Sequence, residues 1–170
     1  MKTYIAYFDI LGFTKIVGNN SMDNISSFVS HFFRETQWRL TSEVIQHGMD
    51  LLPDLTKIEI NCLHYSDSVI FWTNSDSEDD FNRIVDVCYE LYKRSISIQI
   101  PIRGCLTYGE LESIDIFTIK STVKNVNFIS ALIYGPALIE AYQQSENLLL
   151  SACVLGDGLI KKKDRKVFNI

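Results

Sequence analysis

The chain has 170 residues, of which 46% are apolar and 22% charged, and this balance predicts a single globular domain spanning residues 1–170. The net charge of −5 argues against a nucleic-acid partner, and the absence of a signal peptide or a long apolar run argues against a membrane protein. The four cysteines form no paired motif and are expected to be buried free thiols of a cytoplasmic protein: Cys62, Cys88, Cys105 and Cys153.

The first third of the chain predicts one strand and one long helix. Residues 2–11 are rich in Ile, Tyr and Phe, which favours a buried strand, and Gly12 permits a tight turn after it. Ser21 suits the N-cap of a helix, because apolar residues recur at helical spacing after it. This helical pattern fades between Gly48 and Pro53.

A hairpin and a second helix are predicted next. Two β-rich runs, 57–63 and 68–73, are separated by the segment HYSD, which places Asp67 at the tip of a hairpin. The acidic segment SDSEDD suits the positive N-terminus of a helix. The apolar stripe of that helix has a clear helical period: Phe81, Ile84, Val85, Cys88, Leu91 and Tyr92.

The second half of the chain returns to strands. Residues 98–108 predict a strand, 111–133 an irregular β arm, 136–146 a short helix and 148–155 a last strand. This order of elements predicts an α+β fold of the ferredoxin-like, split βαβ type. Its antiparallel sheet is expected to carry helices on one face and to leave the other face for a ligand or partner.

Asp9 and Asp67 are the first candidates for chemistry. In the predicted sheet the first strand and the hairpin are neighbours, so the two carboxylates would meet at the same end of adjacent strands. Two such carboxylates repel each other unless a cation lies between them, and oxygen ligands suit Mg²⁺ or Mn²⁺. Taken singly, Asp9 could instead cap the following turn, and Asp67 could serve as a turn former. Taken together, they favour the metal.

Four segments, in family order along the chain, resemble the class III nucleotidyl cyclases: FDILGFTKIV, HYSDSVIF, IRGCLTYGEL and YGPALIEAYQQSE. The short stand-alone chain most resembles the pyrimidine cyclases of bacterial Pycsar anti-phage defence. Those enzymes are homodimers that make cyclic UMP or cyclic CMP and so activate a separate effector. The resemblance implies a cyclase-type domain that converts UTP, in preference to CTP, to the 3′,5′-cyclic nucleotide and pyrophosphate.

The resemblance also implies roles for particular residues. Asp9, the carbonyl of Ile10 and Asp67 would hold two divalent cations, Mn²⁺ or Mg²⁺. The backbone amides of the next four residues would cradle the β- and γ-phosphates: Leu11, Gly12, Phe13 and Thr14. Leu63 would shorten the base pocket to suit a pyrimidine. Arg103 would stabilise transition-state charge or bind the phosphates, although an isolated arginine is about as often part of a surface salt bridge.

Three positions depart from the family pattern and keep alternatives open. Purine cyclases carry a base-reading Lys or Glu where this chain has Leu63, and the last helix of the family supplies an Asn and an Arg where this chain has Ile139 and Gln143. The leading hypothesis is a pyrimidine cyclase, followed by a purine cyclase and by a catalytically silent ferredoxin-like module that binds a nucleotide or a partner. Leu63 argues against the second hypothesis, and the two retained aspartates argue against the third.

A homodimer with active sites at the subunit interface is also expected. The arm at 111–133 carries apolar residues that a monomer would expose: Ile114, Ile116, Phe117, Ile119 and Phe128. A two-fold arrangement would bring Arg103 of one subunit toward the aspartates of the other. The lysines of the KKKDRK segment at 161–166 could reach the same place, although such a segment is more often a solvated tail.

Overall fold

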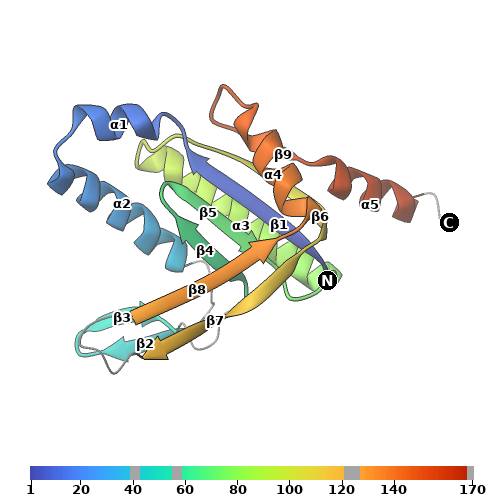
Figure 1. Ribbon diagram of the computed structural model, residues 1–170, viewed down its shortest axis with the longest axis horizontal. Helices are drawn as coiled ribbons and strands as arrows, with labels where there is room; N and C mark the ends of the chain where they lie inside the picture. The colour runs from blue at the N-terminus through green and yellow to red at the C-terminus, as the bar shows by residue number, and fades with distance from the viewer. Residues whose placement is uncertain (39–42, 55–58, 121–126, 168–170) are drawn as a thin grey trace.

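The computed structural model describes residues 1–38, 43–54, 59–120 and 127–167, and within these ranges it describes side chains except at 33–35, 37, 53, 114–120, 127–131 and 165–167 (Figure 1). The chain is mixed α+β, which confirms the predicted class. In chain order the elements are β1 (Lys2–Ile10), α1 (Phe13–Asn19), α2 (Met22–Gln37), β2 (Val44–His47), β3 (Asp50–Pro53), β4 (Asn61–Tyr65), β5 (Ser68–Trp72), α3 (Glu78–Ser97), β6 (Ile102–Glu110), β7 (Glu112–Lys120), β8 (Asn127–Tyr134), α4 (Pro136–Glu146), β9 (Cys153–Leu155) and α5 (Asp157–Val167).

The main sheet has five strands in the order β4-β5-β1-β6-β9, so β1 lies at its centre. Strands β4, β5, β1 and β6 pair antiparallel, whereas β9 runs parallel to β6. The prediction of an entirely antiparallel sheet is therefore wrong at this edge. The hairpins β2–β3 and β7–β8 form two separate two-stranded sheets.

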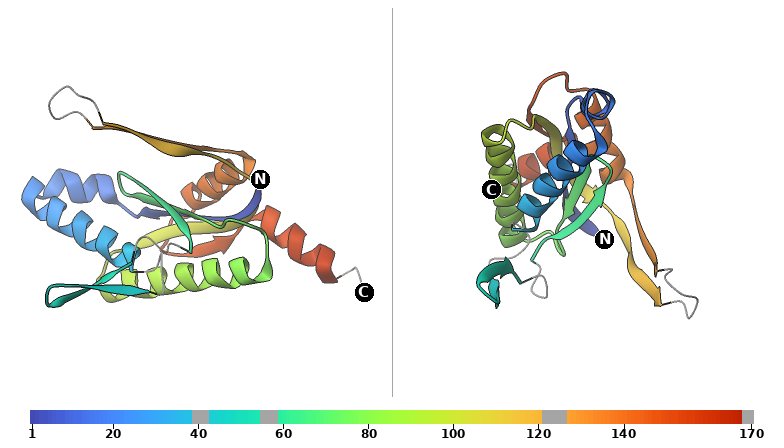
Figure 2. Two further views of the ribbon diagram at one scale, coloured as in Figure 1. Left: turned by 90° about the horizontal axis from the view of Figure 1, so that it is seen from below. Right: turned by 90° about the vertical axis from the view of Figure 1, so that its left-hand side faces the viewer.

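Both faces of the sheet are covered by helices. Along β1 the side chains alternate, so that Tyr4 and Phe8 pack with α3 on one face, while Ile5 and Tyr7 pack with α4 on the other. Figure 2 shows α3 and α4 on opposite sides of the sheet. The prediction that helices cover only one face is wrong, because α4 covers the second face. Its small buried residue Ala137 lets α4 approach β6 closely.

Several elements outside the central strands differ from the sequence prediction. The helix predicted after Ser21 is confirmed, since Ser21 Oγ accepts a hydrogen bond from the Asn24 amide at 3.4 Å, but α2 ends at Gln37. The segment after it contains the β2–β3 hairpin, which turns at Gly48 with φ 65°. The short helix α1 and the C-terminal helix α5 were also not predicted.

The predicted β arm is confirmed as the antiparallel pair β7–β8, which projects away from the main sheet (Figure 2). Its pairing register is irregular between Ile114 and Phe117. The side chains expected to form an apolar patch on the arm lie outside the described part of the structure: Ile114, Ile116, Phe117, Ile119 and Phe128.

The four cysteines are free thiols, as predicted. Cys88 and Cys105 are buried and Cys62 is partly buried, but Cys153 is exposed, so the expectation that all four are buried is wrong there. Cys153 begins the three-residue edge strand β9, which leaves its side chain accessible. Burial raises the pKa of Cys105 to about 12, so this thiol stays protonated at neutral pH.

Candidate active site

Asp9 lies near the C-terminal end of β1, in a row of polar side chains that crosses three strands. The pairing register places Asp9 opposite Ser68 of β5 and opposite Arg103 of β6. Ser68 Oγ donates to Asp9 Oδ1 at 3.2 Å, and Arg103 donates to Asp9 Oδ2 from Nε at 3.2 Å and from Nη2 at 3.0 Å. Asp9 is 8% exposed, and its carboxylate is thus largely buried. Both of its oxygens accept hydrogen bonds from protein donors.

Asp67 lies in the turn between β4 and β5, after Ser66, whose φ of 55° is left-handed. Its backbone carbonyl accepts a hydrogen bond from the Ile10 amide at 3.2 Å, which fastens the turn to the end of β1. The structure therefore brings Asp9 and Asp67 to the same end of neighbouring strands. Burial raises the pKa of Asp9, and the charge of Asp67 raises it further, whereas Arg103 and Ser68 lower it. This arrangement favours a cation beside the two carboxylates.

Arg103 connects Asp9 to the C-terminal end of α4. Its Nη1 donates to the backbone carbonyls of Glu146 at 3.0 Å and Leu148 at 3.3 Å, and its Nη2 forms an ion pair with the Glu146 carboxylate. The Arg103 side chain is 16% exposed. Arg103 contacts Asp9 of its own chain, and its expected approach to the aspartates of a partner subunit stays a prediction.

Tyr7 and Ser68 extend the hydrogen bonding around Asp9, and the sequence analysis missed both. The Tyr7 hydroxyl and Ser68 Oγ are 2.7 Å apart, and because Ser68 donates to Asp9, Tyr7 is the donor to Ser68. Burial raises the pKa of Tyr7 to about 12, so the phenol remains a donor at neutral pH. The signal for Tyr7 was its position two residues before Asp9, which puts both side chains on one face of the strand.

The turn after β1 provides fewer backbone donors than the resemblance implied. The Leu11 amide donates to the Pro101 carbonyl at 2.8 Å and is therefore not available to a phosphate, so the prediction that Leu11 binds phosphate is wrong. Gly12 has φ 78°, a left-handed conformation that favours glycine, and α1 starts at Phe13. Phe13 and Thr14 are thus the first residues of a helix, where amides have no partner within the helix.

A groove of about 740 Å³ lies beside the aspartates, between the β4–β5 hairpin and α4. Its lining includes Asp67 and Leu63, which the structure thereby places in one cavity. Tyr7 and Tyr142 meet there edge to face, with ring centroids 5.6 Å apart and an interplanar angle of 88°. Ile139, which the sequence resemblance matched to an asparagine of the cyclases, also lines the groove. The groove is therefore mainly apolar, with Asp67 and Ser68 at its polar end.

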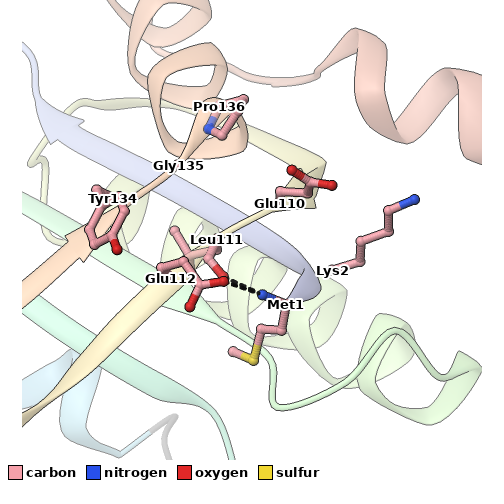
Figure 3. A pocket seen from close by; sticks show the side chains of 8 residues that line it. All are labelled: Met1, Lys2, Glu110, Leu111, Glu112, Tyr134, Gly135 and Pro136. Carbon is pink, nitrogen blue, oxygen red and sulfur yellow. Dashed lines mark hydrogen bonds and ion pairs between the residues drawn. The ribbon is translucent and has the colours of Figure 1, made fainter.

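A second pocket, of about 440 Å³, lies at the base of the β7–β8 arm (Figure 3). The Met1 ammonium donates there to the Leu111 carbonyl at 2.8 Å and pairs with Glu112 at 3.0 Å. Tyr134 and Pro136 form another part of its wall. Because this pocket lies at the opposite end of β1 from Asp9, it does not belong to the same site.

The lysines of the C-terminal segment are not near the aspartates in this chain. Lys162 Nζ lies 4.4 Å from the centre of the Tyr4 ring and 3.8 Å from that of Tyr108, and it pairs with Asp76 at 2.9 Å. Lys163 lies over Phe81 and pairs with Glu78 at 3.3 Å. Lys162 and Lys163 of helix α5 therefore pack on aromatic rings, whereas Lys161 and Asp164 are exposed, so the segment is helical and only partly solvated.

Replacing Lys162 with Met is expected to lower the free energy of unfolding by about 1 kcal/mol at pH 7, since the cation–π and ion-pair contacts are lost while the apolar stem remains. Hydrogen bonds from Lys162 and Tyr108 lower the pKa of Asp76. Stability from this depressed pKa is present above the ordinary pKa of an aspartate and is lost as the pH falls through the lowered value. Urea unfolding at neutral and acidic pH checks both effects, with the exposed Lys161→Met as the control.

No protein-family model matches this sequence, and no curated protein matches it either. Across the described residues, no cluster of three or more His, Cys, Asp or Glu side chains is arranged to hold a metal ion. A cation at this site would therefore depend on the two aspartates and backbone carbonyls. None of the helices within the described ranges is long and apolar enough to cross a membrane.

Proposed function

We propose that the protein is a metal-dependent pyrimidine nucleotide cyclase that converts UTP, or alternatively CTP, to the 3′,5′-cyclic nucleotide and pyrophosphate. The observation that carries this proposal is the meeting of Asp9 and Asp67 at one end of β1 and β5, next to a groove of about 740 Å³ that Asp67 and Ser68 help to line. The strand order β4-β5-β1-β6, with helices between β1 and β4 and between β5 and β6, supports a ferredoxin-like, cyclase-type fold.

The residues at the end of β1 have the donor chemistry that two divalent cations require. Asp9, Asp67 and the Ile10 carbonyl would supply hard oxygen ligands, which suit Mg²⁺ and Mn²⁺. When bound, such ions lower the pKa of a ribose hydroxyl and neutralise phosphate charge. The mutual repulsion of the two carboxylates supports this assignment, because a cation removes it.

The other residues of the site would bind and orient the nucleotide. Cyclisation is an in-line attack of the ribose 3′-oxygen on the α-phosphorus, with pyrophosphate as the leaving group. The guanidinium of Arg103, at the polar end of the site, would hold phosphate oxygens. The amides of Gly12, Phe13 and Thr14 would contact the β- and γ-phosphates from the turn after β1. Ser68 and Tyr7 would keep Asp9 in one orientation.

Leu63 would form part of the base pocket, and its replacement tests the pyrimidine assignment. A Leu63→Lys variant is expected to lose pyrimidine turnover by about tenfold or more and to gain little purine turnover, because the ammonium enters a mainly apolar groove. Steady-state rates with UTP, CTP, ATP and GTP measure the change, and Leu63→Met controls for packing. An unchanged rate and preference would show that Leu63 does not line the base site.

The active form is proposed to be a homodimer whose sites lie at the subunit interface. Ile139 and Tyr142 of α4 and Tyr65 of the hairpin line the groove and are all exposed in the single chain. A second copy covering this face would enclose the base, which an open groove leaves in contact with water. The cyclic product would act as a second messenger in antiviral defence in the bacterial cytoplasm, where a separate effector responds to it.

A silent nucleotide-binding or partner-binding module is the second candidate, because Arg103 already neutralises Asp9 and because Ile139 and Gln143 replace the expected Asn and Arg. The deciding experiment is incubation of the purified protein with Mn²⁺ and each of the four ribonucleoside triphosphates, with products identified by mass spectrometry. A cyclic pyrimidine nucleotide is expected. A cyclic purine nucleotide would favour a purine cyclase, and no cyclic product at all would favour the silent module.

A further inference from the structure

Asp9 is a buried carboxylate whose nearest charged neighbours have opposite effects on it. Asp67 repels its charge, and Arg103 compensates for it with two hydrogen bonds to one oxygen. A buried carboxylate is strongly destabilised when it loses a cation that compensates for its charge. The chain without a bound metal ion therefore carries its own counter-ion, in direct contact with an expected metal ligand.

The contacts of Arg103 fall into two groups. Two hydrogen bonds go to Asp9 Oδ2, and three further contacts go to the end of α4, namely the Glu146 carboxylate and the carbonyls of Glu146 and Leu148. The α4 contacts include a charged partner, so the guanidinium remains neutralised when Asp9 is taken away from it. Arg103 can thus give up Asp9 without leaving the site.

We propose that Arg103 is a built-in counter-ion that competes with the divalent cation for Asp9, and that Glu146 retains the guanidinium beside the site once the cation has bound. This inference rests on the proposed function, since it takes Asp9 to be a cation ligand. It makes Glu146 a positioning residue that acts through Arg103. It also gives the single arginine two successive partners, first Asp9 and then the phosphates of the substrate.

Mn²⁺ binding to the full chain, without nucleotide, tests the competition directly. The signal of free Mn²⁺ in electron paramagnetic resonance gives the dissociation constant. Arg103→Gln is expected to bind Mn²⁺ about tenfold more tightly than the wild type, because the ion no longer has to displace a cation. Glu146→Gln is expected to bind it about threefold more weakly, because Asp9 is then the one remaining carboxylate partner of Arg103 among the described residues.

Arg103→Lys separates contact from net charge. The lysine keeps the positive charge but cannot hold Asp9 and the end of α4 with one planar fork, so an affinity between those of the wild type and Arg103→Gln is expected. Lys93→Gln and Glu90→Gln make the same two charge changes at a surface pair on α3, where side-chain oxygen and nitrogen are 3.2 Å apart, and should leave Mn²⁺ affinity unchanged. Thermal melting with and without Mn²⁺ verifies that each variant folds, and Mn²⁺ should raise the melting temperature most in Arg103→Gln.

The inference is overturned if Arg103→Gln binds Mn²⁺ no more tightly than the wild type, or if Arg103→Lys matches the wild type and only net charge matters. Unchanged or tighter binding by Glu146→Gln would remove the role given to Glu146. The nucleotide assay remains a separate measurement. If Arg103→Gln binds Mn²⁺ more tightly but the wild type makes no cyclic product, the role of Arg103 as a counter-ion is supported and the cyclase is rejected. If the wild type makes the product but Arg103→Gln has an unaltered Mn²⁺ affinity, the cyclase is supported and the counter-ion role is rejected.

Discussion

Asp9→Asn is expected to reduce the formation of cyclic nucleotide by about a thousandfold or more, because an amide is a poor ligand for the divalent ions and several kcal/mol of charge stabilisation are lost. Asp67→Asn is expected to have the same effect. The fold should survive both changes. Asp9→Asn removes the repulsion between the two carboxylates, and Arg103 keeps its contacts with the Glu146 carboxylate and with two backbone carbonyls.

Turnover with Mn²⁺ and UTP or CTP, read by mass spectrometry, measures this loss, and melting temperatures show that the variants are folded. Asp86→Asn is the matched control, since it makes the same chemical change at an exposed position of α3. Wild-type turnover in either the Asp9 or the Asp67 variant would contradict the assignment of both carboxylates as metal ligands.

Gly104→Val is expected to destabilise the protein by about 3 kcal/mol, which lowers the melting temperature of a chain of this size by about 6–12 °C. Gly104 lies opposite Phe8 in the β1–β6 register, and a Cβ at this position would meet the Phe8 ring and come within 2.6 Å of the Tyr7 carbonyl. Phe8 is fully buried and packs edge to face against Phe71, with ring centroids 6.5 Å apart, so its ring has little room to move.

Differential scanning calorimetry measures this effect, with Gly18→Ala as the control. A Cβ at Gly18 in α1 would have no heavy atom within 4 Å, and its φ is not positive, so that substitution should be neutral or slightly stabilising. A Gly104→Val variant as stable as the wild type would show that the Phe8 ring is free to repack.

The central strands could be predicted from the sequence because their patterns are local. A few neighbouring residues are enough to predict each of three features: the strand β1, the turn at Gly12 and the hairpin tip at Asp67. The pairing of β1 with β5 follows from the expected topology. The helix α5 could not be predicted in this way. Its KKKDRK run is typical of a solvated face, and its place is fixed by distant contacts, such as that of the Gly158 amide with Glu140 at 3.0 Å.

The environment of the candidate site was less predictable than its residues. Asp9, Asp67 and Leu63 were identified from pattern and resemblance, but the partners of Arg103 depend on how the end of α4 returns to β6. That return cannot be deduced from spacing, because Arg103 and Glu146 are separated by the whole β7–β8 arm. The position of α4 on the face opposite α3 could not be predicted for a different reason. The buried side of α4 is made of small residues, which give only a weak amphipathic pattern.

The attachment of α4 has a consequence for selectivity. The helix is fixed to its surroundings at three levels, by the packing of Ala137 and Ala141 with the sheet, by the bond from Thr107 Oγ1 to Glu140 at 2.9 Å and by the contacts of Glu146 with Arg103. Tilting the helix away from the sheet would break all three attachments together. The width of the groove is therefore set by the side chains that line it, and in the proposed cyclase this fixed width would exclude a base larger than the groove.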